Sequence, residues 1–192
     1  MKNVFKSVIV PTIVLTLICA ISTLALGFTN KITEDKIADQ AKKAEQQAMS
    51  RIISASEFST EQVEYNGEMV DYHIAKAQDG NILGYIFTAK HHGYGGDVKV
   101  MIGIDTTDKI AAIEVIDASN ETPGLGANVL NNSFWEQFKG KTEGLSASKA
   151  GASGNEIKAV TGATISSRAV VGAVNTAFDI YKLVTKDGGN NG

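Results

Sequence analysis

The chain has 192 residues, a formal net charge of -3 at pH 7 and a single cysteine, Cys19. One cysteine excludes a disulfide framework and a cysteine-ligated zinc or iron–sulfur site. The near-neutral charge argues against a dedicated nucleic-acid binder, so no nucleic-acid partner is expected.

The N-terminal segment differs sharply in composition from the rest of the chain. The run from Val8 to Phe28 is 21 residues long and contains no charged residue. A helix needs roughly 20 residues to cross the hydrocarbon core of a bilayer. We therefore predict a transmembrane helix at 8–28. The short segment 1–7 is expected in the cytoplasm, because Lys2 and Lys6 fit the positive-inside bias.

A cleaved signal peptide is the alternative interpretation of this segment. The apolar run is longer than the usual apolar region of a signal peptide, and Leu24-Ala25-Leu26 lacks the small residues of a cleavage site. An uncleaved anchor is favoured. It would place the protein in the lipid bilayer of the cell membrane as a single-pass protein, with its C-terminal domain outside the cytoplasm.

A helical stalk is expected at 29–57, after the apolar run. The periodicity predicts a helix over 33–56, with one face formed by Ile37, Ala41, Ala44, Ala48 and Ile52. Because this stripe is mostly alanine, it is narrow. It favours a stalk or a partner-packing helix over a core element.

The main domain is expected at 58–187 and begins with short β-branched and aromatic runs. Turn residues such as Asn66-Gly67 and Asp79-Gly80 separate these runs, as in antiparallel hairpins. Strands are predicted at 63–65, 72–77, 82–89, 98–104 and 110–116.

The second half of this domain is more helical. Ser133 to Glu136 forms a capping-box pattern that predicts a short helix. A loop is expected at 142–155, a last strand at 157–160 and an amphipathic helix from Ser166 onward, followed by a disordered tail at 188–192. The helix carries an apolar stripe of Val170, Val174, Phe178 and Tyr181. The order of elements predicts an α+β fold, an antiparallel sheet with flanking helices.

The histidines do not indicate a metal or catalytic site. His91 and His92 are adjacent on a predicted strand and would point to opposite faces, and His73 lies in another strand. No nucleophile–base pair is recognisable either. No catalytic residue and no metal site are therefore expected.

The strongest local feature is the segment from Thr161 to Ser167, which precedes the last predicted helix. It contains Gly162, Ala163, Ile165 and four hydroxyl residues. A helix N-terminus of this kind favours a phosphate. Thr164, Ser166 or Ser167 would equally serve as an ordinary helix cap, and the spacing alone prefers the cap.

A second feature is the segment from Glu121 to Gly126, with the sequence Glu-Thr-Pro-Gly-Leu-Gly. Its Pro-Gly pair indicates a turn. Taken alone, the segment is compatible with a simple connection between a strand and a helix.

Together, in this order and behind one apolar span, the two segments resemble the covalent FMN-binding domain family. This family includes the G subunit of Rnf electron-transport complexes and the C subunit of the sodium-pumping NADH:quinone reductase. Thr161-Gly-Ala-Thr164 with Ser166 and Ser167 resembles its flavin-attachment motif, and Glu121 to Gly126 resembles a second shared segment. The resemblance covers nearly the whole chain, and the compact length fits the Rnf protein better.

The resemblance implies roles for ten residues. Thr164 would carry FMN through a phosphoester bond made by a flavin transferase, with FAD as donor. Thr161, Gly162, Ala163, Ile165 and Ser166 would lie against the phosphate and ribityl chain. Glu121, Thr122 and Leu125 would approach the flavin from the second segment, and Tyr94, within Gly93–Gly96, would lie near the ring. Family members often carry an acidic residue at the position of Lys158. If that acid helps the transferase to recognise its target, attachment would be slower here, but it is still expected.

By the same resemblance, the protein is expected to be a membrane-anchored flavoprotein. It would relay electrons through FMN, together with the other subunits of an Rnf-type complex that couples ferredoxin:NAD⁺ electron transfer to ion transport. The alternatives are a C-type subunit of the quinone reductase or a free-standing membrane flavoprotein. The non-redox alternative is an anchored extracytoplasmic binding or scaffold module, in which the 161–167 segment only caps a helix.

Overall fold

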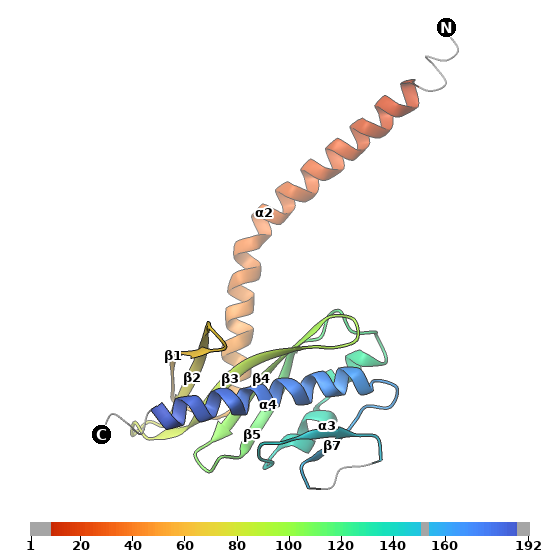
Figure 1. The fold of residues 1–192 in the computed structure, drawn as a ribbon. Helices are drawn as coiled ribbons and strands as arrows, with labels where there is room; N and C mark the ends of the chain where they lie inside the picture. Colours follow the sequence, from red (N-terminus) through yellow and green to blue (C-terminus); the bar gives the residue numbers. More distant parts are fainter. Residues whose placement is uncertain (1–8, 151–153, 188–192) are drawn as a thin grey trace. The chain divides into compact units, whose positions relative to one another are not determined.

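The computed structural model describes residues 9–150 and 154–187, so the predicted N-terminus at 1–7 and tail at 188–192 lie outside the described residues. The chain divides between Gln46 and Gln47 into two compact units. A single helix, α2 (Val10–Ile52), contributes most of its length to the first unit and its last turns to the second (Figure 1).

The first unit contains one helix segment that is long and apolar enough to cross a membrane. It runs from Val10 to Lys31, with 22 residues and a mean hydropathy of 2.1. Threonine hydroxyls in this segment donate to carbonyls one turn earlier, for example Thr16 to Thr12 at 2.9 Å and Thr23 to Cys19 at 2.8 Å. The helix therefore satisfies these polar groups internally, as a bilayer requires.

The second unit is built on a five-stranded antiparallel sheet in sequential order. Its strands are β1 (Glu57–Tyr65), β2 (Glu68–Lys76), β3 (Ile82–His92), β4 (Asp97–Asp105) and β5 (Ile110–Asp117). All five predicted strands are confirmed. The hairpin order arises because each pair of successive strands is joined by a short turn, which makes neighbours in sequence neighbours in the sheet.

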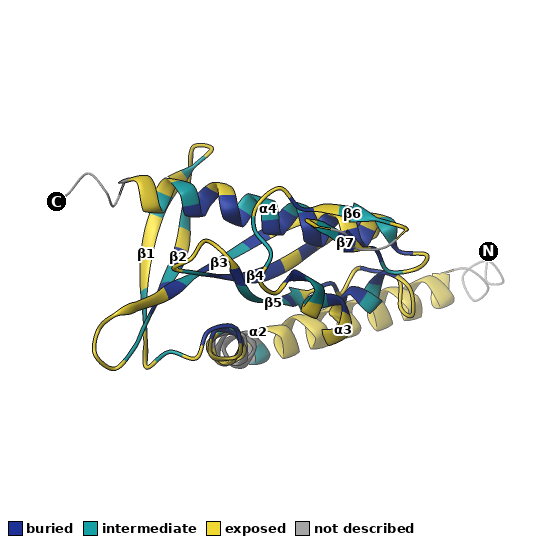
Figure 2. Ribbon diagram, turned by 90° about the horizontal axis from the view of Figure 1, so that it is seen from below, coloured by how far each residue is buried: buried dark blue, intermediate teal, exposed yellow. Residues whose placement is uncertain are grey.

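The remaining elements follow the sheet. They are η2 (Gly126–Leu130), α3 (Asn132–Trp135), η3 (Glu136–Phe138), β6 (Ser146–Ser148), β7 (Glu156–Lys158) and α4 (Thr164–Asp187). The long helix α4 crosses one face of the sheet, over β3 and β4 (Figure 1). The burial pattern in Figure 2 shows its sheet-facing side buried and its outer side exposed.

The main core lies between α4 and the sheet. Its α4 contribution includes the predicted stripe of Val170, Val174, Phe178 and Tyr181, all buried against strand residues such as Phe87. This confirms the helix and its buried face. The helix begins at Thr164, two residues earlier than predicted.

A second, smaller core covers the other face of the sheet and includes the last turns of the helix that was expected to be a stalk. Ala48, Met49 and Ile52, in the last turns of α2, are buried in a cluster with Ile86 and Met101. The approach is close because β4 has a glycine here: a Cβ at Gly103 would lie 2.3 Å from Ile52 Cγ2. The helix ends at Ile52 and not at 56, and residues 53–56 connect it to β1, which begins at Glu57.

Three further sequence predictions are wrong in detail. The capping box at Ser133 does not form: α3 begins at Asn132, its N-cap is Asn131, and no side chain caps it. The predicted loop at 142–155 contains β6, which pairs in parallel with β7. The last strand ends at Lys158, short of the predicted 160.

Candidate functional site

A cleft of about 700 Å³ lies at the N-terminal end of α4. This volume is within the usual range for small-molecule and cofactor sites. Three segments far apart in sequence form most of it: the β3–β4 hairpin tip, the loop before η2, and the turn that leads into α4; Lys149, after β6, completes the lining. Its walls comprise Tyr94, Glu121, Thr122, Leu125, Gly126, Lys149 and every residue from Lys158 to Ser166.

All ten site residues proposed from the sequence lie along this one cleft. The lining also contains Lys158 and four residues that were not proposed from the sequence, namely Gly126, Lys149, Ala159 and Val160. Lys149 had no detectable sequence signal, because it lies in a Gly-, Ser- and Ala-rich segment that is typical of a loop.

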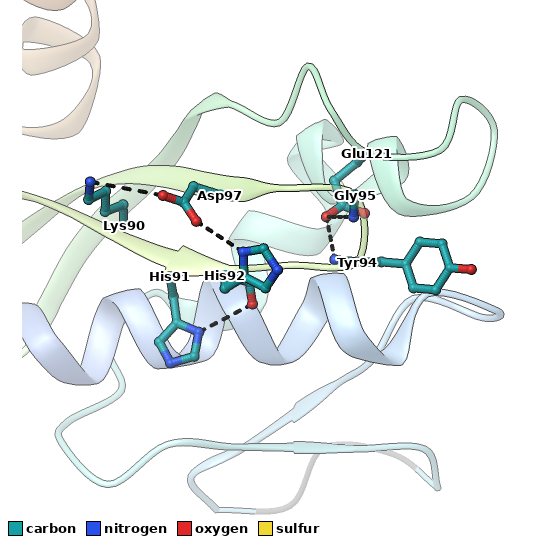
Figure 3. A network of polar contacts seen from close by, with 7 residues as sticks. All are labelled: Lys90, His91, His92, Tyr94, Gly95, Asp97 and Glu121. Carbon is teal, nitrogen blue, oxygen red and sulfur yellow. Dashed lines mark hydrogen bonds and ion pairs between the residues drawn. The ribbon is translucent and has the colours of Figure 1, made fainter.

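Glu121 joins the three segments instead of facing the cleft as an open carboxylate. It is 3% exposed. Its Oε1 accepts hydrogen bonds from the backbone N–H groups of Tyr94 at 2.7 Å and Gly95 at 3.3 Å, while its Oε2 accepts from Ser166 Oγ at 2.6 Å. Figure 3 shows the carboxylate against the hairpin tip, with the Tyr94 ring projecting away from it. Glu121 therefore holds the cleft walls together.

Two glycines make room for this carboxylate. A Cβ at Gly93 would lie 2.1 Å from Glu121 Oε1, and a Cβ at Gly126 would lie 2.2 Å from Glu121 Oε2. Real Cβ atoms do not approach a polar atom so closely. The glycines of both motifs thus serve this buried contact, and the hairpin tip is more than a plain turn.

The hydroxyls at the start of α4 are divided between structural and free groups. Ser167 Oγ accepts from the Val160 N–H at 2.9 Å and donates to the Ala163 carbonyl at 2.9 Å, and Ser166 is bound to Glu121. Both serines are buried. Among the described residues, the hydroxyl of Thr164 forms no hydrogen bond, although Thr164 lines the cleft. The two serines are therefore committed to these contacts, whereas Thr164 and Thr161, which also lines the cleft, remain available.

The rim of the cleft is unusually apolar for an exposed surface. Tyr94 is 69% exposed, Leu125 48% and Ile165 51%. All three line the cleft, one from each of its three segments. Large apolar side chains gathered around a hollow are typical of a ligand site, and these would suit a flat aromatic ligand.

The histidines lie outside the cleft lining. His92 Nδ1 is 3.1 Å from Asp97 Oδ1, while the ring of His91 lies against Gly172 of α4. Figure 3 shows the two rings on different sides of β3. No group of three or more metal-ligating side chains occurs among the residues that the structure describes.

Comparison with known proteins identifies the class to which this fold and cleft belong. Residues 93–179 match the family model of the FMN-binding domain. The fold is similar to that of the C subunit of the Na⁺-translocating NADH-quinone reductase from Parabacteroides distasonis, with a TM-score of 0.51, 24% identity and coverage of 60% of this chain and 68% of that one. It is also similar to Shewanella oneidensis NqrC, with a TM-score of 0.51 and 17% identity over 62% of this chain and 63% of that one.

Relatives matched over almost their whole length define the family more narrowly. Residues 1–52 match the RnfG N-terminal region. The chain is 33% identical to the G subunit of the Na⁺-translocating ferredoxin:NAD⁺ oxidoreductase complex of Acetobacterium woodii, with 91% of each chain covered. It is 32% identical to the G subunit of the proton-translocating ferredoxin:NAD⁺ oxidoreductase complex of Clostridium ljungdahlii, again with 91% of each covered. The chain therefore belongs to the family of G subunits of ion-translocating oxidoreductase complexes. With its apolar helix, this membership indicates a membrane-anchored protein.

Proposed function

We propose that this protein is the flavoprotein electron-transfer subunit of an ion-translocating ferredoxin:NAD⁺ oxidoreductase complex, and that FMN is joined through its phosphate to Thr164. Family membership supports the first part. Structural observations support the second: of the four hydroxyl residues at the start of α4, Ser166 and Ser167 are bound and buried, whereas the hydroxyls of Thr161 and Thr164 line the cleft with no hydrogen bond among the described residues. Of these two, Thr164 is the first residue of α4.

The start of α4 is chemically suited to a phosphate. The first N–H groups of a helix have no partner within the helix, and the dipole favours negative charge there. Thr164 is the first residue of α4, so a phosphate on its hydroxyl would lie beside these groups. In the attachment step, the Thr164 oxygen forms a bond to the FMN phosphorus of FAD. The bond to the AMP phosphate breaks, AMP leaves and the hydroxyl proton is released to solvent.

A separate flavin transferase is expected to make this bond, because the chain itself offers no nucleophile–base pair near Thr164. Glu121 is committed to Tyr94, Gly95 and Ser166, so the cleft holds no free carboxylate among the described residues to act as a base. Thr164 is therefore presented as an acceptor.

The rest of the cleft would hold and orient the cofactor. Bound FMN supplies redox chemistry that amino-acid side chains lack. Leu125, Ile165 and Tyr94 offer apolar walls for its ring system, and Thr161 and Thr122 offer hydroxyl groups in the same cleft. Glu121 acts indirectly, because it fixes these walls relative to Thr164.

The same proposal includes the topology. Lys2 and Lys6 before the apolar segment favour a cytoplasmic N-terminus, and the FMN-binding unit would then lie outside the cytoplasm. A covalent bond suits that location, because a cofactor lost there would not be replaced. The other subunits of the complex would supply and remove electrons.

Intact-mass measurement of the full chain produced with a flavin transferase tests the covalent bond. The wild type should gain the mass of FMN less one water and show a fluorescent band after denaturing electrophoresis. Thr164→Ala should lose both, while Thr161→Ala, in the same turn, should keep them. Thr164→Ser restores a hydroxyl and should recover part of the label. An unmodified wild type would refute the covalent attachment and favour the anchored scaffold. A labelled Thr164→Ala would refute the assignment of the bond to Thr164.

A further inference from the structure

Lys158 lies at an edge of the cleft where its backbone is held on both sides. It is the last residue of β7 and lines the cleft together with the turn that contains Thr164. The Lys158 N–H donates to Gln137 Oε1 at 2.8 Å, and Gln137 Nε2 donates back to the Lys158 carbonyl at 3.3 Å. This double contact fixes the point from which the exposed Lys158 side chain extends.

The positive charge of Lys158 has no negative partner in the described part of the chain. It forms no ion pair among residues 9–150 and 154–187. The described cleft lining contains one acidic residue, Glu121, and this carboxylate is buried and bound to two backbone N–H groups and one hydroxyl. The accessible charges of the lining are therefore the cations of Lys149 and Lys158.

Lys158 is better placed than Lys149 to meet a group attached at Thr164. It belongs to the same continuous wall, from Lys158 to Ser166, whereas Lys149 belongs to the separate segment after β6. Lys158 also borders a second, shallower hollow of about 410 Å³, next to Thr161. A lysine side chain is long and flexible, so the ammonium group of a lysine at this point can reach a negatively charged group bound in the cleft.

We propose that Lys158 is the counter-ion of the phosphodiester that would join FMN to Thr164. This inference rests on the proposed function. A phosphodiester carries one negative charge at neutral pH, and the start of α4 supplies only partial positive charge. Lys158 would supply the full opposite charge, so it stabilises the flavin-bearing form of the protein and not the unmodified form.

The test compares the same substitution in two forms of the full-length protein. Thermal unfolding in detergent is followed for wild type and Lys158→Gln, each purified with and without attached FMN. We expect Lys158→Gln to lower the midpoint of the FMN-bearing form by about 2 °C more than that of the unmodified form, as for one partly solvated ion pair. The difference should shrink in 1 M salt, because salt screens exposed charges. Lys158→Arg keeps the positive charge and should restore the wild-type midpoint of the FMN-bearing form.

Two lysines provide matched controls. Lys149→Gln removes the other cation of the cleft, and Lys109→Gln removes an exposed lysine in the β4–β5 turn. Neither should reproduce the full difference. Equal midpoint shifts in both forms of Lys158→Gln, or a larger difference for Lys149→Gln, would overturn the inference. If Lys158→Gln takes up no FMN while Lys158→Arg does, the need for the cation is shown directly.

Intact mass separates failure of this inference from failure of the proposed function. Suppose that wild type and Lys158→Gln both gain FMN normally, and that Lys158→Gln lowers the midpoint equally in the FMN-bearing and unmodified forms. This result would refute the role of Lys158 but would not affect the proposed attachment at Thr164. A wild type that never gains FMN refutes the attachment itself.

Discussion

Ser166 Oγ donates a buried hydrogen bond of 2.6 Å to Glu121 Oε2, across 45 positions of sequence. The same carboxylate accepts from the N–H groups of Tyr94 and Gly95 at its other oxygen. A buried charge normally needs a cation, but here two backbone dipoles and a hydroxyl compensate it. One side chain therefore connects the hairpin tip, the loop before η2 and the first turn of α4.

Glu121→Gln should destabilise the domain although it keeps the side-chain shape. The amide has one acceptor oxygen, so either the hairpin N–H groups or the Ser166 O–H lose their acceptor. An unsatisfied buried group costs about 1–3 kcal/mol. Denaturant unfolding of the full chain should show a loss in this range.

Ser166→Ala provides the partner variant for this contact. If the hydrogen bond is the source of the effect, Glu121→Gln with Ser166→Ala should cost less than the sum of the two single changes. Strict additivity would contradict the assignment of this bond.

Gly93→Ala should be more damaging than Gly172→Ala. The new Cβ at Gly93 would meet the fixed Glu121 Oε1 at 2.1 Å. At Gly172 it would meet the ring of His91, which is exposed and can rotate away. We expect a loss of about 1–3 kcal/mol for Gly93→Ala, as for an overpacked site, with a smaller loss for Gly172→Ala. Urea unfolding measures both, and the reverse order would show that the hairpin tip adapts.

Alkaline pH should destabilise the domain through Tyr181. Burial and the hydrogen bond to Asp108 Oδ1, at 2.5 Å, raise the pKa of this phenol above its ordinary value. The unfolded chain therefore loses the proton first, at a pH of about 10. Above that pH the unfolded state binds fewer protons than the native state, so the free energy of unfolding falls as pH rises.

Tyr181→Phe removes this titrating group and should reduce the fall in stability between about pH 9 and 11, where an ordinary tyrosine begins to ionise. Urea unfolding at several pH values measures it. The pKa of Tyr72 is raised by burial and by its hydrogen bond to Glu61, so Tyr72→Phe should act in the same direction. If the variant with both Tyr181→Phe and Tyr72→Phe lost stability with rising pH as steeply as the wild type, this explanation would be refuted.

Ile52→Ala should destabilise the second unit although Ile52 belongs to the helix that carries the apolar span. Ile52 is 6% exposed and packs in the smaller core. Loss of a buried isoleucine side chain costs about 2–4 kcal/mol when a cavity remains. Ala44→Ser, on an exposed position of the same helix, should change the stability by less than about 0.5 kcal/mol. Equal effects of the two would contradict the packing at Ile52.

The local elements were predictable because their signals are local. Asn66 and Gly67 have positive φ values of 53° and 82°, the backbone that a tight hairpin turn requires, and they stand between β1 and β2 as expected. The stripe from Val170 to Tyr181 predicted the buried face of α4 for the same reason. Each of these patterns depends only on residues that are close together in the sequence.

The sequence predictions were wrong where contacts with residues distant in the sequence determine the structure. The alanine stripe of α2 gave no indication that Ala48 and Ile52 are buried, because their partners lie in the sheet. The room for Ile52 comes from Gly103 of β4. The parallel pair of β6 and β7 has three residues in each strand and no alternating pattern. At α3, the pattern at Ser133 was outweighed by a start one residue earlier, at Asn132.

The sequence by itself determined the apolar span, the antiparallel hairpins, the last helix and the two motifs that resemble an FMN-binding domain. These follow from periodicity, turn residues and local motifs. Only the tertiary structure decided that Glu121 is a buried connection, that Ser166 and Ser167 are bound while Thr164 is free, and that Lys158 lies at the edge of the cleft without an acidic partner among the described residues. The physical reason is that a hydrogen bond or a charge pair depends on which distant atoms fold into reach.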